Sequence, residues 1–272
     1  MPTRRTTTRA GVELVYWTWP GDGPPALLLH GIGTYGRSWD LFADTVAGRL
    51  RLVASDARGH GESGRPPAGY TPADFVADAV AILDAAGIDR TVVVGHSMGG
   101  LHSIYLAATH PERVSALVVV DAGVEPMAEG SERARRLLTE RPARFTTPGA
   151  AREYLERTSP GYSEAVYRNR LEWLFRSEAG ELVWRSDPHA LAEIMRSRTD
   201  PTDRWVRLRT IAAPTLVVRG TRSNVLSAEV AARMVAELKG GKLLELDAGH
   251  NVALDRRREL ADAVVRLATG DR

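Results

Sequence analysis

A serine stands at the centre of the segment Gly95-His96-Ser97-Met98-Gly99. An apolar run, Thr91–Val94, precedes this segment, and a helix-forming stretch, Gly100–Thr109, follows it. A buried strand, a G-x-S-x-G turn and a helix together are typical of a nucleophile elbow, a strained turn that exposes the serine Oγ. We therefore predict that Ser97 is a nucleophile that attacks a carbonyl carbon.

A histidine near the end of the sequence has the setting of the matching base. His250 follows a strand-like run at 243–246 and a short loop that ends in Gly249. A loop histidine just beyond a strand can take the proton of the serine and later give it to the leaving group. His60, His102, His110 and His189 have no such setting, and packing is the predicted role of His96 and of His30.

The loop His30-Gly31-Ile32-Gly33 follows another apolar run, Ala26–Leu29. We expect its Ile32 backbone N–H, together with that of Met98 at the start of a helix, to receive the oxyanion of a tetrahedral intermediate. Each donor of this kind contributes about 3 kcal/mol in comparable sites. The sequence holds no metal-ligand cluster, phosphate-binding glycine loop or dinucleotide fingerprint, so we predict no cofactor and no metal.

Short apolar runs and amphipathic helical stretches alternate along the chain, and they must position these residues. The runs are Val- and Leu-rich without alternation, which is typical of strands buried on both faces of a parallel sheet. They lie at Ala26–Leu29, Leu50–Ala54, Thr91–Val94, Ala116–Val120 and Thr215–Val218, and helices are predicted at Pro72–Ala86, Gly100–Thr109 and Ala228–Leu238. The alternation predicts the α/β class, with a doubly wound, mostly parallel sheet.

The alternation stops after Asp121 and resumes at Ala213. Between them the chain is rich in Arg, Glu, Tyr and Trp at helical spacing. We predict two core segments, 1–124 and 206–272, and an inserted all-helical lid at 125–205. A pocket under this lid would suit a medium-sized, fairly hydrophobic substrate, with Trp39 and Trp173 as candidate contacts and lid arginines available to a carboxylate.

Composition narrows the classes of protein that the chain can be. Hydrophobic residues make up 43% and charged residues 26% of 272 residues, which excludes a disordered or collagen-like chain. The 36 basic and 34 acidic residues are interleaved, so nothing indicates nucleic-acid binding. Without cysteine there is no disulfide framework, and no run suggests a signal peptide or a spanning helix. We expect a soluble, cytoplasmic protein that acts on a small molecule, without a membrane partner.

The order of these motifs resembles that of the α/β-hydrolase superfamily, especially its capped, esterase-like branch. The resemblance extends from the loop at 30–33, through 55–63 (SDARGHGES) and the elbow at 95–100, to 214–220 and Gly249-His250. It implies an α/β-hydrolase fold, with nucleophile, acid and histidine in that chain order. The segment 55–63 resembles a family loop whose roles are mainly structural.

The sequence departs from that family at the position of the acidic residue that pairs with the histidine. The family usually places it a few residues after the strand predicted at Thr215–Val218, but residues 219–226 (RGTRSNVL) contain no carboxylate. Some members place it after the preceding strand, where Asp121 stands. We therefore predict Asp121 as the acid. The alternatives are Asn224, which could only orient the ring, no acid at all, Glu125 and Asp247.

These residues predict a serine hydrolase of carboxylic esters or lactones that forms an acyl-enzyme on Ser97. The same residues would also serve C–C bond hydrolysis of a diketone, thioester or amide cleavage, or cofactor-free perhydrolysis. Dehalogenation and epoxide hydrolysis are disfavoured, since in this fold both need a carboxylate at position 97. A ligand-binding or receptor protein with little turnover is the alternative of another class, and the missing carboxylate after Val218 favours it.

Overall fold

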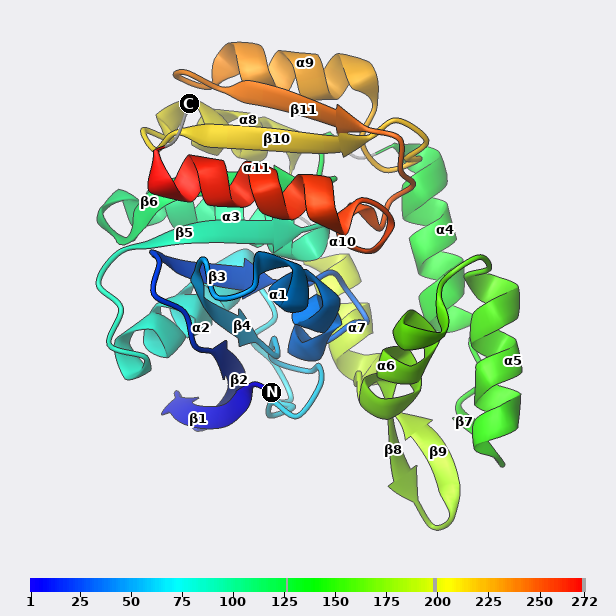
Figure 1. The fold of residues 1–272 in the computed structure, drawn as a ribbon. Helices are drawn as coiled ribbons and strands as arrows, with labels where there is room; N and C mark the ends of the chain where they lie inside the picture. The colour runs from blue at the N-terminus through cyan, green and yellow to red at the C-terminus, as the bar shows by residue number, and fades with distance from the viewer. Residues whose placement is uncertain (126, 198–199, 271–272) are drawn as a thin grey trace.

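The structure is a computed structural model that describes residues 1–125, 127–197 and 200–270. Its centre is an eight-stranded sheet in the order β1-β2-β4-β3-β5-β6-β10-β11 (Figure 1). The strands are β1 (Thr3–Arg9), β2 (Val12–Trp19), β3 (Pro25–Leu29), β4 (Arg51–Ser55), β5 (Thr91–His96), β6 (Val114–Val120), β10 (Thr215–Gly220) and β11 (Lys242–Leu246). From β4 to β11 every neighbouring pair is parallel, as the sequence predicts.

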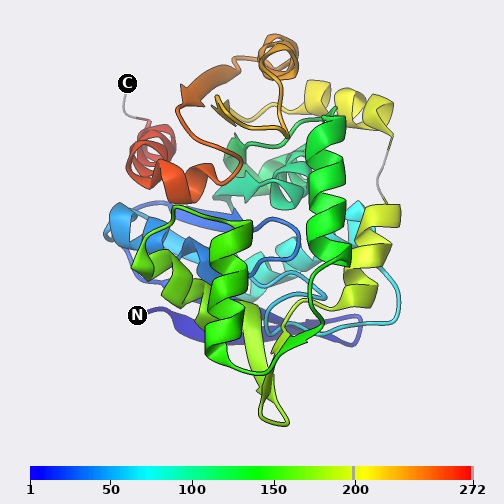
Figure 2. The same ribbon diagram turned by 90° about the vertical axis from the view of Figure 1, so that its right-hand side faces the viewer.

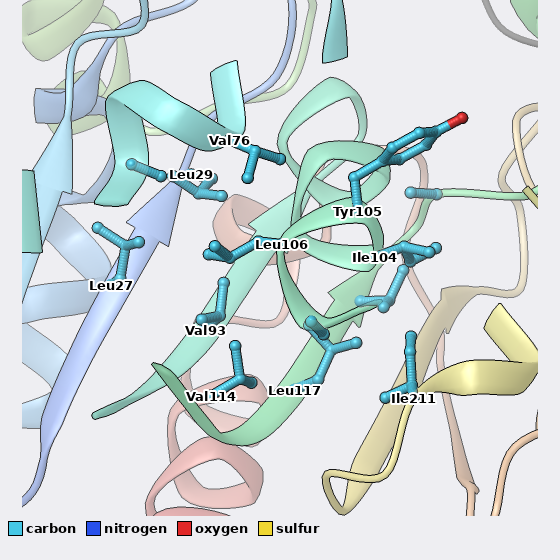
Figure 3. Packing of buried hydrophobic residues seen from close by; sticks show 14 of the residues in the cluster. Leu27, Leu29, Val76, Val93, Ile104, Tyr105, Leu106, Val114, Leu117 and Ile211 are labelled. Carbon is cyan, nitrogen blue, oxygen red and sulfur yellow. The ribbon is translucent and has the colours of Figure 1, made fainter. Parts of the chain in front are cut away.

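Helices cover both faces of this sheet. They are α1 (Asp40–Val46), α2 (Pro72–Ala85), α3 (Met98–Thr109), α8 (Pro201–Thr210), α9 (Ala228–Glu237), α10 (Val252–Asp255) and α11 (Arg257–Thr269). Side chains alternate along each buried strand, so Leu27 and Leu29 pack toward α2 and α3, whereas Ala26 and Leu28 pack toward α1 and α11. Figure 3 shows the first of these two cores, where Leu106 of α3 lies between the strands and Val76. No described helix is long and apolar enough to span a membrane.

The sequence analysis did not predict the first two strands. β1 and β2 form an antiparallel hairpin, and β2 joins the sheet by pairing antiparallel with β4. β1 is an edge strand of Thr and Arg whose side chains are mostly exposed. A search for continuous apolar runs passes over such a strand, because only strands buried on both faces carry that pattern.

A lid covers the carboxyl edge of the sheet, and we use this name for the elements from α4 to α7 (Figure 2). It contains α4 (Ala128–Thr139), α5 (Pro148–Thr158), α6 (Glu164–Leu174) and α7 (Pro188–Arg196), with strands β7 (Arg144–Phe145), β8 (Phe175–Glu178) and β9 (Glu181–Trp184). The prediction of an all-helical lid is therefore wrong. Ala179 and Gly180 both have positive φ, 51° and 82°, as a tight hairpin turn between β8 and β9 requires.

The chain returns to the core at α8. Trp205 and Leu208 of this helix are buried in the same cluster as Ile104 of α3. The predicted boundary after residue 205 falls inside α8. The division into a core and an inserted lid stays a prediction, and this packing favours a return to the core near Pro201.

Candidate active site

Ser97 lies on the turn between β5 and α3 with φ 54° and ψ −116°, a strained backbone conformation for a residue with a side chain. Two glycines make this turn possible. A Cβ on Gly95 would stand 2.3 Å from the Gly99 carbonyl oxygen, and one on Gly99 would stand 2.3 Å from the Leu29 carbonyl oxygen. The Ser97 N–H donates to the Val120 carbonyl at 3.0 Å. The turn therefore presents a partly exposed Ser97 at the carboxyl edge of the sheet.

His250, on the loop between β11 and α10, reaches Ser97 from the other side of the edge. Its Nε2 lies 3.0 Å from Ser97 Oγ, and its Nδ1 lies 2.7 Å from Asp121 Oδ2. Its backbone is also held, because His96 Nε2 lies 2.9 Å from the His250 carbonyl oxygen. Burial lowers the pKa of His96 to about 3, so this ring is neutral and its Nε2–H is the donor. The predicted packing role of His96 thus includes holding His250.

Asp121 follows β6 in a left-handed conformation, with φ 46°, and is completely buried. The loop after β10, which lacks a carboxylate, supplies hydrogen-bond donors to Asp121 instead. Gly220 N–H donates to Oδ1 at 3.0 Å, and Ser223 Oγ–H donates to Oδ2. Together with His250, these donors hold the carboxylate in one orientation. Neither Gly220 nor Ser223 was predicted, since neither residue type shows that it faces an acid.

The alternative acids have other partners. Asn224 contacts Glu129 at 3.4 Å. Glu125 bonds to Trp205 and Arg233, and the exposed Asp247 pairs with Arg222 and Arg256. Of the four candidates that the sequence left open, the structure brings Asp121 alone to His250.

Two buried histidines hold the loop that carries Ile32. His30 donates from Nδ1 to the Gly31 carbonyl at 2.8 Å and accepts from the Ala57 N–H, and His60 Nε2 accepts from the Gly33 N–H at 2.9 Å. The loop lies against the nucleophile, because a Cβ on Gly31 would stand 3.4 Å from the Ser97 Cβ.

The Ile32 and Met98 side chains pack in one apolar cluster. Within the described part of the chain, neither backbone N–H is used in a hydrogen bond. The assignment of these two donors to the oxyanion stays a prediction.

These neutral histidines predict a pH-dependent stability. Burial lowers the pKa of His30 to about 4 and those of His60, His96 and His102 to about 3, against about 6.5 in an unfolded chain. Between these values the unfolded state binds more protons than the folded state, so stability falls as pH falls from about 6.5 toward 4. We expect the free energy of unfolding to drop by up to about 1.4 kcal/mol per pH unit for each histidine.

Urea unfolding between pH 7.5 and 4.5 measures this slope. His102, whose ring stacks on Phe75 at 4.2 Å, offers a variant outside the Ser97 site, and the half-buried His110 is the control. His102→Met should reduce the slope and His110→Gln should not. A stability that stays constant down to pH 4.5 would contradict this assignment.

A cavity of about 190 Å³ adjoins the site, between the lid and the sheet edge. His30, His96 and Asn251 line it, and these residues are next to Gly31, Ser97 and His250 in the chain. Its other lining residues come from the segment between β3 and the start of α1, from α4 and the turn after it, from α5, α6 and the end of β9, and from the start of the C-terminal helices.

The two predicted substrate contacts have different outcomes. Trp39 lines the cavity, and its buried indole N–H has no hydrogen-bond partner among the described residues. Trp173 is not among the residues that line the cavity. It packs at 5.0 Å from the Trp17 ring, with the Arg37 guanidinium 4.3 Å from its own ring. This packing does not favour a contact between Trp173 and substrate, which stays a prediction. Helical spacing does not distinguish a lid tryptophan that faces the cavity from one that packs against the core.

Among the described residues, no three His, Cys, Asp or Glu side chains are grouped so that they could hold a metal ion.

One family model, which is described as alpha/beta hydrolase fold, matches this chain. That model matches residues 24–256, which is most of the chain. The chain belongs to the α/β-hydrolase family. The fold and the enzyme class that the sequence resemblance implies, an α/β hydrolase, are thereby confirmed.

Individual proteins named as hydrolases are similar to this chain over most of its length. A protein of Variovorax paradoxus, provisionally named the carbamate hydrolase RutD, is 32% identical over 92% of this chain and 94% of its own. The 2-(acetamidomethylene)succinate hydrolase of Mesorhizobium japonicum is 27% identical over 78% of this chain and 76% of its own. An α/β hydrolase of Novosphingobium aromaticivorans of known structure is 29% identical, with a TM-score of 0.84 over 98% of each chain.

Proposed function

We propose that this α/β hydrolase cleaves a carboxylic ester or lactone through an acyl-enzyme on Ser97. One observation carries the proposal: an unbroken line of hydrogen bonds runs from Ser97 Oγ through His250 to Asp121. A serine is a weak nucleophile until a base takes its proton, and this arrangement supplies the base and a group that orients it. A binding protein would not need hydrogen bonds that join a serine, a base and an acid, so their presence here favours an enzyme.

The first half of the reaction forms the acyl-enzyme. Ser97 Oγ attacks the carbonyl carbon while its proton passes to His250 Nε2, and the carbonyl oxygen becomes an oxyanion. The bond to the leaving oxygen then breaks, and that oxygen takes the proton from His250. An ester releases its alcohol at this point, whereas the alcohol formed from a lactone stays attached to the acyl chain.

The second half returns the enzyme to its starting state. His250 takes a proton from water, and the resulting hydroxide attacks the acyl carbon. The bond to Ser97 Oγ breaks, Ser97 regains the proton from His250, and a carboxylic acid leaves. Asp121 keeps Nδ1 protonated through both halves and stabilises the imidazolium when it forms.

The Ile32 and Met98 N–H groups face no partner in the described chain, and we assign them to the oxyanion in both halves. Met98 begins α3, where the unpaired N–H groups of the helix favour negative charge. Fixed donors of this kind lower the barrier because they need no rearrangement as the charge develops.

A second candidate is hydrolysis of an amide or carbamate at the same residues. The name of the Variovorax relative, a carbamate hydrolase, favours it. The steps are the same, except that His250 delivers its proton to a leaving nitrogen.

Partitioning of the acyl group between water and hydroxylamine tests the proposed acyl-enzyme. Three substrates that share the same acyl group are hydrolysed in the presence of hydroxylamine. Two are esters of different alcohols, and the third is the anilide. An acyl-enzyme on Ser97 predicts one ratio of hydroxamate to acid for all three, because each passes through the same intermediate. A ratio that changes with the leaving group would show that water attacks the substrate directly and would contradict the proposal.

A further inference from the structure

The cavity beside Ser97 is lined by two arginines that come from different parts of the lid. Arg141 lies between α4 and β7, and Arg170 lies on α6. None of the described residues that line this cavity is an aspartate or glutamate. The cavity therefore carries two positive charges with no carboxylate in its own wall.

Among the residues that the structure describes, Arg141 contacts only neutral groups. Its guanidinium donates to the Ser186 hydroxyl at 2.9 Å and to the Ser186 carbonyl at 3.2 Å, and it lies 4.3 Å from the centre of the Trp184 ring. No described carboxylate lies within 4.0 Å of it. Burial lowers the pKa of Arg141 to about 10, which is the effect of removing a cation from water without an anion to compensate.

Arg170 is arranged in a similar way. Its guanidinium lies 4.7 Å from the centre of the Tyr162 ring, and the Tyr162 hydroxyl accepts a hydrogen bond from Asn251 at 3.0 Å. Asn251 also lines the cavity and is next to His250 in the chain. No described carboxylate lies within 4.0 Å of Arg170.

Most other lid arginines differ from this pair, because they have acidic partners on the surface. These pairs are Arg135 and Arg136 with Glu132, Arg144 with Glu181, Arg152 with Glu156 and Glu164, Arg176 with Glu178, Arg185 with Glu62, and Arg196 with Glu193. A partly buried arginine without such a partner is costly to maintain unless an anion joins it.

We propose that Arg141 and Arg170 bind a carboxylate at the far end of the substrate whose acyl carbon is attacked by Ser97. This inference rests on the proposed function for the reacting end and names the class of substrate, a small carboxylate-bearing acyl compound. A volume of about 190 Å³ is below the range of about 300–1,000 Å³ typical of drug-sized ligands, and this favours a small metabolite. Guanidinium groups suit the task, since they can give two parallel hydrogen bonds to one carboxylate.

Binding without turnover tests the anion site by itself. Glutarate and its neutral analogue glutaramide are titrated into the Ser97→Ala variant and the wild type by calorimetry, with thermal unfolding as a second readout. We expect glutarate to bind and to raise Tm, and glutaramide to bind at least about 10-fold more weakly. This comparison needs no arginine variant to fold. Equal binding of the two compounds, or binding of neither, would overturn the inference.

The arginine variants then locate the binding. Arg141→Met and Arg170→Met should each lower the affinity for glutarate about 10- to 100-fold, because each removes charge-assisted hydrogen bonds. Arg168→Met is the matched control, since Arg168 lies on α6 two residues from Arg170, is exposed and does not line the cavity. Unchanged glutarate affinity in both folded variants would overturn the assignment to these two residues.

Kinetics separate this inference from the proposed function. The mono-4-nitrophenyl ester of glutaric acid is compared with the same compound methylated on its free carboxylate, and the rate with Ser97→Ala is subtracted as background. We expect the acid to have a kcat/KM about 10- to 100-fold higher, and both arginine variants to lose this preference while still hydrolysing the methylated ester. Equal hydrolysis of both esters would contradict the carboxylate site and leave the proposed function standing. Bound glutarate with no turnover of either ester would contradict the proposed function instead.

Discussion

Replacing Ser97 by alanine is expected to lower kcat about 10⁶-fold on any substrate that the wild type hydrolyses, with a residual rate still above that in water. The substitution removes the one atom that forms the covalent bond, and Ile32, Met98 and His250 keep their places. The fold should survive, because among the described residues the Ser97 side chain bonds only to His250, and the turn is fixed by Gly95 and Gly99. Steady-state kinetics with a chromogenic ester, together with thermal unfolding, measure both effects.

Ser103 provides the matched control for this variant. It lies on α3 as a buried serine and donates to the Gly100 carbonyl at 2.7 Å, away from His250. Ser103→Ala should change kcat by less than about 10-fold, whatever its cost in stability. Comparable loss of activity in the two variants would mean that α3 merely supports the site, and Ser97 would not be the nucleophile.

Replacing Asp121 by asparagine is the change with the second largest expected effect, a loss of about 10⁴-fold in kcat. Three donors meet at this carboxylate, from His250, Gly220 and Ser223. An amide has one accepting oxygen and a donating NH₂ group, so at least one donor would face another donor. His250 would be driven to the tautomer that protonates Nε2, and this tautomer cannot take a proton from Ser97.

The cost in stability follows from the same contacts. Asp121 is fully buried, and leaving one of its donors without an acceptor costs about 1–3 kcal/mol in the free energy of unfolding. Activity must therefore be measured at a temperature at which unfolding data show the variant to be folded.

Asp247→Asn tests whether another carboxylate near His250 in the chain could take the role assigned to Asp121. Asp247 lies three residues before His250 and is exposed with two arginine partners. We expect its kcat to stay within about 2-fold of the wild type, because surface ion pairs contribute little. Near-normal turnover in Asp121→Asn, or a large loss in Asp247→Asn, would remove Asp121 from its assigned role.

Much of this fold could be predicted because its buried strands are unambiguous. Runs such as Ala116–Val120 have apolar side chains on both faces. In the Gly-x-Ser-x-Gly turn, a Cβ at either Gly95 or Gly99 would stand 2.3 Å from a backbone oxygen, so only glycine fits at these two positions. Both features are local, so the sequence alone displays them. The position of His250 beyond a strand is local in the same sense.

The acid could not be settled from sequence, because its identity depends on contacts between distant residues. Asp121 and Ser223 are 102 positions apart and meet only when β6 and β10 pair. The lid was predicted less well for a related reason. β8 and β9 are short and of mixed polarity, and the packing of Trp173 depends on Trp17 and Arg37, far away in the chain.

The central claim is that Ser97 is an activated nucleophile held by His250 and Asp121. Intact-mass analysis after treatment with a small alkyl fluorophosphonate tests it most directly, with Ser97→Ala and Ser103→Ala treated in parallel. We expect one adduct on the wild type and on Ser103→Ala, much slower formation of that adduct on Asp121→Asn, and no adduct on Ser97→Ala. An adduct that persists in Ser97→Ala, or none on folded wild type that still hydrolyses a short acyl ester, would contradict it.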